Sequence, residues 1–351
     1  MRELSLMVPG DPETVTGGYA YDRAVVAALA RRGWDARLER LPGDFPVPAK
    51  ESIDFSLDLI ASRPPGRVVM VDGLAFGVLP AARLRALGRP VAALVHHPLA
   101  LEGGRPPDRA AAVAATERAA LAVAAVVVVS SPATARVLIA DYGVPAERLA
   151  VALPGTGPRP PAVGTGAVPT ILTVASLTPR KGHATLVAAL ARLRERPWRA
   201  VFVGDDRRDP ACAAAVRRAI AAHGLAGRID VTGAVTPAAL GRHVAAADLF
   251  ALVSAYEGYG MAFAEALSAG LPIVAADGGA VAETVPPAAR LLVPPGDVEA
   301  TAAAVGRLLG DAGLRRRLAA ASRQAGRRLP GWDETAASVE AALQRIMARA
   351  L

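Results

Sequence analysis

Two glutamates, Glu257 and Glu265, lie on either side of a glycine-rich turn in the segment EGYGMAFAE. The apolar run Leu249–Val253 before them predicts a strand, and the glycines of the turn delay the next helix to about Met261. The segment therefore offers a loop carboxylate, free N–H groups at a helix start, and a second carboxylate one turn into the helix. Carboxylates accept hydrogen bonds from sugar hydroxyls, and helix N-termini bind anions. This pattern favours a site for a phosphorylated sugar, although the spacing alone also fits glutamates that only cap and solvate a helix.

A second candidate site is the basic pair Arg180–Lys181 in the segment TPRKGH, directly after the expected strand Thr170–Val174. Cations between a strand and a helix suit a diphosphate. Of the 40 basic residues in the chain, only Lys50 and Lys181 are lysines, so a lysine beside an arginine indicates a specific need for an ammonium group. The alternative is an ordinary solvated loop.

A third candidate is the glycine pair Gly17–Gly18, which follows the expected strand Glu3–Val8 and opens a helix. Two glycines here suggest a close approach of the backbone to a phosphate. The full G-x-G-x-x-G fingerprint and the G-x-x-x-x-G-K-[ST] loop are both absent, which argues against a dinucleotide site and a P-loop.

His96 and His97 end the expected strand Val91–Val95 and are candidates for binding a hydroxyl or transferring a proton. A structural role for this pair is the alternative. Glu102, in the segment HHPLALEGG, is a candidate contact of a second substrate, and a plain surface loop explains it equally well. The remaining histidines are expected on helix surfaces: His183, His223 and His243.

The chain lacks the motifs of several other chemistries. No G-x-S-x-G elbow is present, and no group of Cys and His residues has zinc spacing, so we expect neither a catalytic triad nor a metal site. The single cysteine, Cys212, cannot form an internal disulfide, which fits a reducing cytoplasm.

The elements that position these residues predict two α/β domains. A length of 351 residues favours two domains, and 52% hydrophobic with 21% charged residues excludes wholesale disorder. Short β-branched runs alternate with alanine-rich helical stretches, which indicates βαβ units with parallel sheets. Two such domains would face a ligand cleft with the carboxyl ends of their strands. Strands are expected at 68–71, 126–129, 199–203, 229–231 and 272–275, and helices at 19–32, 184–194, 211–223, 237–246 and 332–351.

The domain boundaries follow from a Pro/Gly-rich stretch between Pro154 and Pro169. We expect an N-terminal domain over 1–157, a linker over 158–168, a C-terminal domain over 169–330 and a terminal helix over 331–351.

The net charge of +8 and a pI near 10.4 raise the question of a nucleic-acid partner. The arginines are spread along the chain, and aromatic residues at 4% are too few for base-stacking platforms, so we expect no nucleic acid. A diffuse positive field can help bind phosphates or hold the protein weakly at an anionic bilayer. The longest apolar run, Ala119–Val129, falls short of the roughly 20 residues of a membrane span, so we expect a cytoplasmic protein with at most peripheral contact at the inner membrane face.

Taken together, these motifs resemble the retaining GT-B glycosyltransferases of family 4, the group 1 transferases. The resemblance covers nearly the whole chain and rests on TVASLTPRKGH, WRAVFVGDD, EGYGMAFAE, GLPIVAADGGAVAETV and LLVPPGD. It implies two Rossmann-like domains, an N-terminal acceptor domain and a C-terminal nucleotide-sugar domain, with the terminal helix crossing back onto the first.

The resemblance also implies roles for particular residues. Glu265 would hold the ribose of the donor nucleotide, Glu257 the donor sugar, and His96 would lie near the donor sugar and the acceptor. Catalytic roles are implied for His96, Lys181 and Glu257, and weak acceptor contacts for His97 and Glu102. The donor-binding residues would be Gly17, Gly18, Arg180, Lys181, Glu257, Gly258, Tyr259, Gly260, Met261 and Glu265.

Two positions depart from the family pattern. Ser176 stands where the family often has an arginine that assists the diphosphate, and Pro154-Gly155-Thr156 stands where Pro-Asn-Gly is usual. The expected activity is transfer of a sugar from a nucleotide diphosphate sugar to an unidentified acceptor hydroxyl (of a small molecule, a glycan or a lipid), without metal or cofactor and with retention at the anomeric carbon. The alternatives are a non-catalytic GT-B protein that binds nucleotide or carbohydrate, and a GT-B sugar epimerase.

Overall fold

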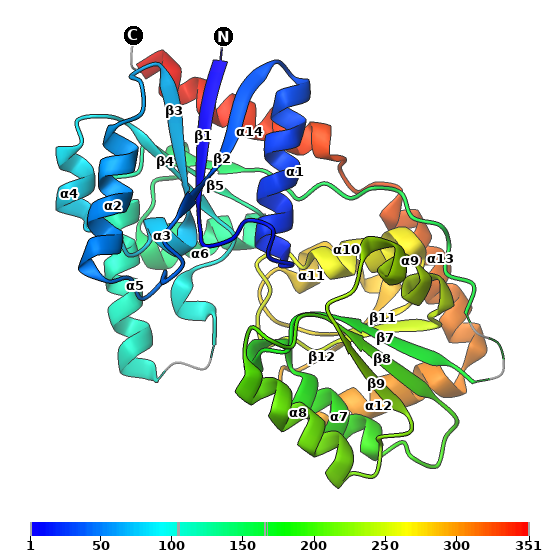
Figure 1. The fold of residues 1–351 in the computed structure, drawn as a ribbon. Helices are drawn as coiled ribbons and strands as arrows, with labels where there is room; N and C mark the ends of the chain where they lie inside the picture. Colours follow the sequence, from blue (N-terminus) through cyan, green and yellow to red (C-terminus); the bar gives the residue numbers. More distant parts are fainter. Residues whose placement is uncertain (1, 104–105, 165, 167, 350–351) are drawn as a thin grey trace. The chain divides into compact units, whose positions relative to one another are not determined.

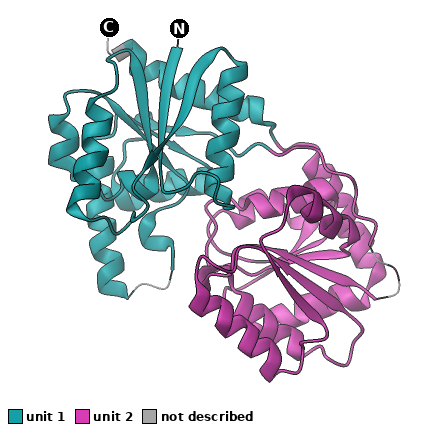
Figure 2. Ribbon diagram, viewed as in Figure 1, with its two compact units in different colours: residues 1–155, 330–351 teal, residues 156–329 magenta. Residues whose placement is uncertain are grey.

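A computed structural model of the chain describes residues 2–103, 106–164, 166 and 168–349, and it contains two α/β units (Figure 1). Unit 1 comprises residues 1–155 and 330–351, and unit 2 comprises residues 156–329 (Figure 2).

Unit 1 is built on a six-stranded parallel sheet with the strand order β2-β1-β3-β4-β5-β6. The inner strands are almost entirely apolar because helices cover both faces of a parallel sheet; all four valines of β5, for example, are buried. The edge strand β2, with the sequence WDARLERL, instead carries charged residues, as edge strands commonly do. The strands are β1 (Arg2–Pro9), β2 (Trp34–Leu41), β3 (Arg67–Asp72), β4 (Val91–Val95), β5 (Val126–Val129) and β6 (Leu149–Val151).

Several helices of unit 1 begin at capping side chains. Thr16 caps α1 by accepting a hydrogen bond from the Tyr19 N–H, and Ser131 caps α6, whose first residue is a proline. The helices are α1 (Gly17–Arg31), α2 (Lys50–Ala61), α3 (Gly73–Phe76), α4 (Ala81–Ala86), α5 (Pro107–Leu121), α6 (Pro132–Tyr142) and α14 (Trp332–Arg349), with 3-10 turns η1 (Leu99–Leu101) and η2 (Ala146–Arg148).

The C-terminal helix α14 packs on α1, β5 and β6 and so belongs to unit 1, as the predicted fold requires. Its Glu340 carboxylate is buried, pairs with Arg32 at 2.6 Å, contacts Arg2, and accepts a hydrogen bond from the Trp34 indole at 3.3 Å. These contacts join the end of the chain to its first two strands.

Unit 2 repeats the architecture with a second six-stranded parallel sheet, in the order β12-β11-β10-β7-β8-β9. Its core lies on both faces of β7 and β10, where Ile171 and Leu172 point to opposite sides and join different apolar clusters. The strands are β7 (Thr170–Val174), β8 (Arg199–Val203), β9 (Ile229–Gly233), β10 (Leu249–Leu252), β11 (Ile273–Ala276) and β12 (Arg290–Val293).

Several helices of unit 2 also begin at capping side chains: Asp209, Thr236 and Asp297 accept hydrogen bonds from the first turns of α8, α9 and α12. Within the described ranges, no helix of either unit is long and apolar enough to cross a bilayer. The helices are α7 (His183–Ala191), α8 (Pro210–Ala222), α9 (Pro237–Ala246), α10 (Met261–Ala269), α11 (Val281–Thr284), α12 (Val298–Gly310) and α13 (Ala312–Gly326), with 3-10 turns η3 (Pro179–Lys181) and η4 (Pro287–Ala289).

Each sheet contains a point where the strand order reverses. In unit 1 the chain leaves β1 for β2 on one side and places β3 on the other; in unit 2 it leaves β7 for β8 and later places β10 on the opposite side of β7. The loops that follow the two strands at such a point diverge, and ligands of open α/β sheets bind there. The two reversals therefore indicate that ligands bind at the loops after β1 and β3 in unit 1 and after β7 and β10 in unit 2.

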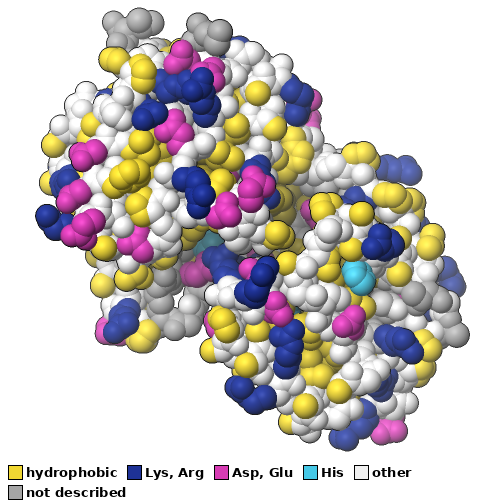
Figure 3. Space-filling model, viewed as in Figure 1, with side chains coloured by type: hydrophobic (Ala, Val, Ile, Leu, Met, Phe, Trp, Pro, Cys, Tyr) yellow, Lys and Arg dark blue, Asp and Glu magenta, His cyan; other side chains and the backbone are white. Residues whose placement is uncertain are grey.

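The basic residues do not form a single stripe on the face drawn in Figure 3. Lys and Arg side chains are distributed over each unit there and alternate with acidic side chains. This distribution lacks the continuous electropositive band that tracks a nucleic-acid backbone.

Candidate active site

The reversal point of the unit 2 sheet holds an ion-paired cluster of Arg180, Lys181 and Glu257. The Lys181 ammonium donates a hydrogen bond to the Glu257 carboxylate at 2.7 Å, and the Arg180 guanidinium lies 3.7 Å from the same carboxylate. Lys181 and Arg180 come from the turn η3 after β7, and Glu257 comes from the loop after β10, 76 residues further along the chain. The structure therefore brings together three of the predicted site residues.

Main-chain hydrogen bonds hold the two loops against each other. The Ala255 N–H donates to the Arg180 carbonyl at 2.7 Å, and the Arg180 side chain donates to the Tyr256 carbonyl at 2.6 Å. The backbone of Glu257 is also bonded to the loop after β11, through Gly278 and Ala280. The cluster is thus supported from three strands of the sheet.

Two glycines permit this backbone path. Gly182 has φ +70°, and a Cβ there would lie 2.2 Å from the Val253 carbonyl oxygen. Gly260 has φ +91°, and a Cβ there would lie 2.6 Å from the Phe263 ring. An L side chain at either position would be strained, so the glycines are needed to position η3 and the start of α10.

Electrostatics keep Glu257 charged although it is buried. Burial raises the pKa of a carboxyl, but the charges of Lys181 and Arg180 outweigh burial and hold the pKa of Glu257 below its ordinary value. The cluster carries two positive charges and one negative charge, so its net charge is positive.

The start of α10 adds main-chain donors. Within the residues that the structure describes, the N–H groups of Gly260, Met261 and Ala262 donate no hydrogen bond inside the chain. Tyr259, by contrast, is buried; its carbonyl accepts a hydrogen bond from Thr284 at 2.6 Å, and burial raises the pKa of its phenol to about 12. In the predicted donor-binding segment Gly258–Met261, the backbone N–H groups of Gly260 and Met261 are therefore better suited to bind an anion than the Tyr259 side chain is.

Glu265 lies on α10 and pairs with Arg159 at 2.9 Å, and both side chains are partly exposed. Arg159 belongs to the Pro/Gly-rich segment before β7. The structure thus gives Glu265 a basic partner of its own, separate from the cluster around Glu257.

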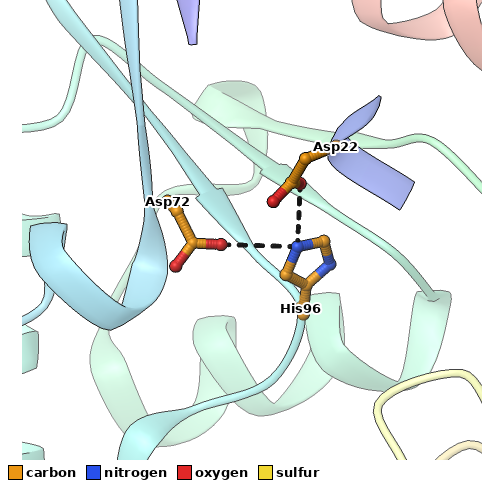
Figure 4. Close-up of side chains that lie close together, drawn as sticks. All are labelled: Asp22, Asp72 and His96. Atoms are coloured by element: carbon orange, nitrogen blue, oxygen red, sulfur yellow. Dashed lines mark hydrogen bonds and ion pairs between the residues drawn. The ribbon is translucent and has the colours of Figure 1, made fainter. Parts of the chain in front are cut away.

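In unit 1, His96 lies between two aspartates at the carboxyl edge of the sheet (Figure 4). Its Nε2 is 3.1 Å from Asp22 Oδ1 and 3.4 Å from Asp72 Oδ2. Asp22 comes from α1, Asp72 ends β3, and His96 follows β4, so the reversal of strand order between β1 and β3 brings them together. Both aspartates are buried, and the edge of the Tyr21 ring packs against the imidazole.

The glycine pair lies beside this group. A Cβ on Gly18 would come within 3.2 Å of the His96 ring, so the glycine leaves room for the imidazole. Gly17 is the first residue of α1, directly after the Thr16 cap.

His97 and Glu102 are brought into direct contact with each other. Their side chains are partly buried, and they lie outside the group formed by His96 and the two aspartates. The end of the segment HHPLALEGG continues into residues 104–105, which lie outside the described part of the chain.

One prediction about histidines is wrong. His183 is buried, 2% exposed, rather than on a helix surface. It follows Gly182 at the start of α7 and packs edge-on against Phe202, and burial lowers its pKa to about 4. The residue stands in the first turn of an apolar helix, where all but a few positions face the core.

Sequence reasoning missed Asp22 and Asp72. A signal for both was available: Asp22 falls on the apolar face of α1 with Tyr21 and Val25, and Asp72 ends β3 directly after its apolar residues 68–71. A charged residue on a buried stripe requires a partner. The carboxylates and the imidazole of this group could hold a metal ion, because their ligand atoms lie within 4.8 Å of one another.

Two sequence families match the chain. The family described as Glycosyl transferases group 1 matches residues 168–311, and the family described as Glycosyltransferase Family 4 matches residues 67–157. The MMP alpha-(1->4)-mannosyltransferase of Mycolicibacterium hassiacum is 30% identical over 286 residues, which is 76% of this chain and 68% of that protein. The GDP-mannose-dependent alpha-(1-6)-phosphatidylinositol monomannoside mannosyltransferase of Mycobacterium tuberculosis is 34% identical over 184 residues. The matched segment makes up 50% of this chain and 47% of that protein.

Solved structures match the fold along almost the whole chain. Sucrose-phosphate synthase from Thermosynechococcus elongatus superimposes with a TM-score of 0.82 at 21% identity, covering 99% of this chain and 100% of that one. HepE from Anabaena, in complex with UDP-glucose, gives a TM-score of 0.76 at 18% identity over 97% of this chain and 99% of that one. The predicted GT-B fold is confirmed by these neighbours and by the two parallel sheets.

Proposed function

The chain belongs to the family 4 (group 1) glycosyltransferases, and on this basis we propose that it transfers a sugar from a nucleotide diphosphate sugar to an acceptor hydroxyl with retention at the anomeric carbon. The observation that carries the proposal is the cluster of Lys181, Arg180 and Glu257 at the reversal point of the unit 2 sheet. Its position, its net positive charge and its single buried carboxylate suit a diphosphate joined to a sugar.

In this proposal the cations act on the leaving group. The bond between the anomeric carbon and the diphosphate oxygen breaks, the acceptor oxygen bonds to the same face of the sugar, and the departing phosphate oxygen takes the acceptor's proton. Lys181, Arg180 and the N–H groups at the start of α10 stabilise the negative charge that develops on the diphosphate. These protein donors take the role that a divalent metal has in other transferases, so we propose a metal-independent reaction.

Glu257 has two tasks in this scheme. Without donor it neutralises part of the charge on Lys181 and Arg180, which limits the cost of holding two cations close together. With donor bound, the phosphates take over those cations and the carboxylate oxygens accept hydrogen bonds from sugar hydroxyls. We assign the Glu265 carboxylate to the ribose of the donor nucleotide. The ribose then competes for this carboxylate with the Arg159 guanidinium, which pairs with it in the structure.

One relative is a GDP-mannose-dependent mannosyltransferase, and one structural neighbour was solved in complex with UDP-glucose, so the base and the sugar are the first unknowns to resolve. A thermal-shift panel of UDP, GDP, ADP and their sugar conjugates identifies the nucleotide, since a ligand at about a hundred times its Kd adds about 2.7 kcal/mol of stability. The sugar conjugate that binds is then tested for transfer with radiolabelled donor and candidate acceptors.

The two lysines of the chain provide a matched pair of variants. Lys181→Ala is expected to lower kcat by about 100- to 1000-fold, as for loss of one group that stabilises a developing oxyanion. Lys50→Ala removes the same charge from an exposed site on α2 and leaves the rate unchanged. Equal rates for the two variants would contradict the assignment of Lys181.

The alternative of a non-catalytic binding protein is favoured by two departures from the family pattern, Ser176 in place of the usual arginine and Gly155 in place of the usual asparagine. It predicts nucleotide-dependent stabilisation without turnover of any donor. An epimerase instead changes the donor sugar in the absence of acceptor, which NMR of the donor detects.

A further inference from the structure

The helix α13 and the turn after it carry a concentrated positive charge. Residues 312–331 contain six arginines and no acidic residue. Residues 192–209 also contain six arginines, but four acidic residues accompany them. The carboxylate that precedes the α13 segment, that of Asp311, caps the helix by accepting a hydrogen bond from the Leu314 N–H at 2.8 Å. This segment is therefore an exception to the mixing of basic and acidic residues along the chain.

Five of the six arginines are exposed to solvent. Arg315 differs, because its guanidinium donates hydrogen bonds to the carbonyls of Leu308 and Leu309 at the end of α12. Arg307 on α12 is exposed as well and lines the same surface groove as Arg317. We call the exposed arginines of the two helices the basic face: Arg307, Arg316, Arg317, Arg323, Arg327 and Arg328.

Three residues of the basic face form a straight stripe along α13, which runs along the outside of unit 2 (Figure 1). At 3.6 residues per turn, Arg316, Arg323 and Arg327 fall within about 40° of one another around the helix axis, and the stripe is about 16 Å long. Leu318 points to the opposite side of the helix and is buried. Gly270 at the end of α10 leaves room for the Arg323 stem, since a Cβ there would lie 2.4 Å from the arginine Cγ.

The charges of the basic face are not compensated by carboxylates of the chain. None of its six arginines forms an ion pair in the described part of the chain, whereas exposed arginines of α4 and α8 pair with Asp54 and Asp206. The helix dipole favours Arg323 and Arg327 near the end of α13, but their spacing of four residues brings two like charges together. The dipole does not favour Arg316, which lies in the first half of the helix. Helix stability therefore explains only part of the basic face, and its charges remain available to an external anion.

Two features favour an anionic lipid surface over a nucleic acid as the partner. Residues 312–331 contain no aromatic side chain on which a base could stack. The other side of α13 packs on α10 and α12, so the helix does not project far enough to enter a groove of a duplex. A row of arginines on one side of a surface helix instead suits a layer of lipid phosphates, where each basic residue strengthens binding about fivefold.

We propose that the basic face docks unit 2 reversibly on the anionic surface of a lipid bilayer. The guanidinium groups pair with lipid phosphates. The helix lies on the surface without inserting, since none of the large hydrophobic residues that the structure shows exposed belongs to α13. Because α13 contacts the C-terminal end of α10, while the cluster around Glu257 lies before its N-terminal end, docking is independent of sugar transfer.

Co-sedimentation of the full-length protein with lipid vesicles tests docking without donor or acceptor. We expect binding to phosphatidylcholine vesicles with about 30% phosphatidylglycerol, loss of this binding as the salt concentration rises from about 50 to about 500 mM, and no binding to pure phosphatidylcholine. The variant Arg316→Gln/Arg323→Gln/Arg327→Gln should bind the anionic vesicles about 100-fold more weakly, because three contributions of about fivefold are lost. Glutamine has a helix propensity close to that of arginine, so the fold is retained.

The matched control is Arg85→Gln/Arg218→Gln/Arg242→Gln. It also lowers the net charge from +8 to +5, but at exposed positions spread over α4, α8 and α9. We expect this variant to bind anionic vesicles within about threefold of the wild type, since charges away from the contact are screened. An equal loss in both triple variants would show that net charge alone attracts the protein and would overturn the role of the basic face.

A fluorescent label shows which surface meets the bilayer. Ala320 lies between the arginines of α13, Ala215 lies on α8, and both are exposed. Ala320→Cys and Ala215→Cys, each in a Cys212→Ser background, are labelled with an environment-sensitive dye. Anionic vesicles should shift the emission of the label on α13 and leave that of the label on α8 unchanged.

Three further results would overturn the inference. The first is a wild-type protein that does not bind anionic vesicles at about 50 mM salt, where the attraction is weakly screened. The second is an unchanged emission of the α13 label in a protein that does bind. The third is release of the protein from the vesicles by a DNA duplex at equal phosphate concentration, which would identify nucleic acid as the preferred partner.

Discussion

Exchanging Lys181 for methionine removes the ammonium 2.7 Å from the Glu257 carboxylate and keeps most of the side-chain volume. At that distance two unit charges attract by about 6 kcal/mol if the effective dielectric constant is about 20. Desolvation of the carboxylate cancels a large part of this, and removal of one partner of a buried pair typically costs about 3 to 5 kcal/mol. Because Arg180 remains 3.7 Å away and Lys181 is 18% exposed, we expect a loss of about 2 to 3 kcal/mol in the free energy of unfolding.

The double variant Lys181→Met/Glu257→Gln separates stability from function. It no longer buries an uncompensated carboxylate, so we expect its free energy of unfolding to return to within about 1 kcal/mol of the wild-type value. Both the single and the double variant should transfer sugar about 100- to 1000-fold more slowly than the wild type, because both lack the ammonium assigned to the diphosphate.

Urea unfolding at several pH values is the assay. The folded-state pKa of Glu257 lies below its ordinary value of 4.5, so the pair stabilises the folded protein above that pH and the stabilisation is lost as the pH falls. The difference between wild type and Lys181→Met should therefore be largest near neutral pH and shrink in acid. Equal unfolding midpoints for the two proteins at neutral pH, with equal m-values, would refute the reasoning.

Three further predictions concern single positions. Arg159→Ala should tighten nucleotide binding by about two- to fivefold, measured by isothermal titration calorimetry, because a partly exposed ion pair to Glu265 is worth about 1 kcal/mol or less and no longer has to be broken; weaker binding would instead make Arg159 a ligand contact. Gly155→Asn, which restores the residue usual in the family, should lower the free energy of unfolding by about 1 to 3 kcal/mol in urea melts, because a Cβ there would lie 2.4 Å from the Trp332 backbone nitrogen; an unchanged midpoint would mean that the start of α14 moves freely. His183→Leu should abolish a loss of stability between about pH 6.5 and 4, because the buried ring has a pKa of about 4 while the unfolded chain binds the proton from its ordinary value of 6.5; the same acid profile in variant and wild type would contradict this origin.

The sequence by itself was enough for the elements whose signals are local. β5 coincides with the predicted strand Val126–Val129, and α9 with the predicted helix Pro237–Ala246. In β5 the local signal is an unbroken run of four valines, which favours a strand. In α9 it is the capping Thr236 followed by Pro237 at the first helical position. The same locality explains why the sequence predicts loops after strands for Lys181 and Glu257, since glycines beside each of them stop regular structure there.

Only the tertiary structure decided which side chains meet. The 2.7 Å contact of Lys181 with Glu257 joins residues 76 positions apart, and His96 meets Asp22 across 74. These approaches follow from the order of strands in each sheet, which no local propensity encodes. Burial of a side chain also depends on distant residues. His183 is a polar residue of the kind expected on a surface, but it is buried against Phe202 because α7 packs on that face of the sheet. The charge states of Glu257 and His183 depend on such distant neighbours, so chemistry at these positions is set by the fold rather than by residue type alone.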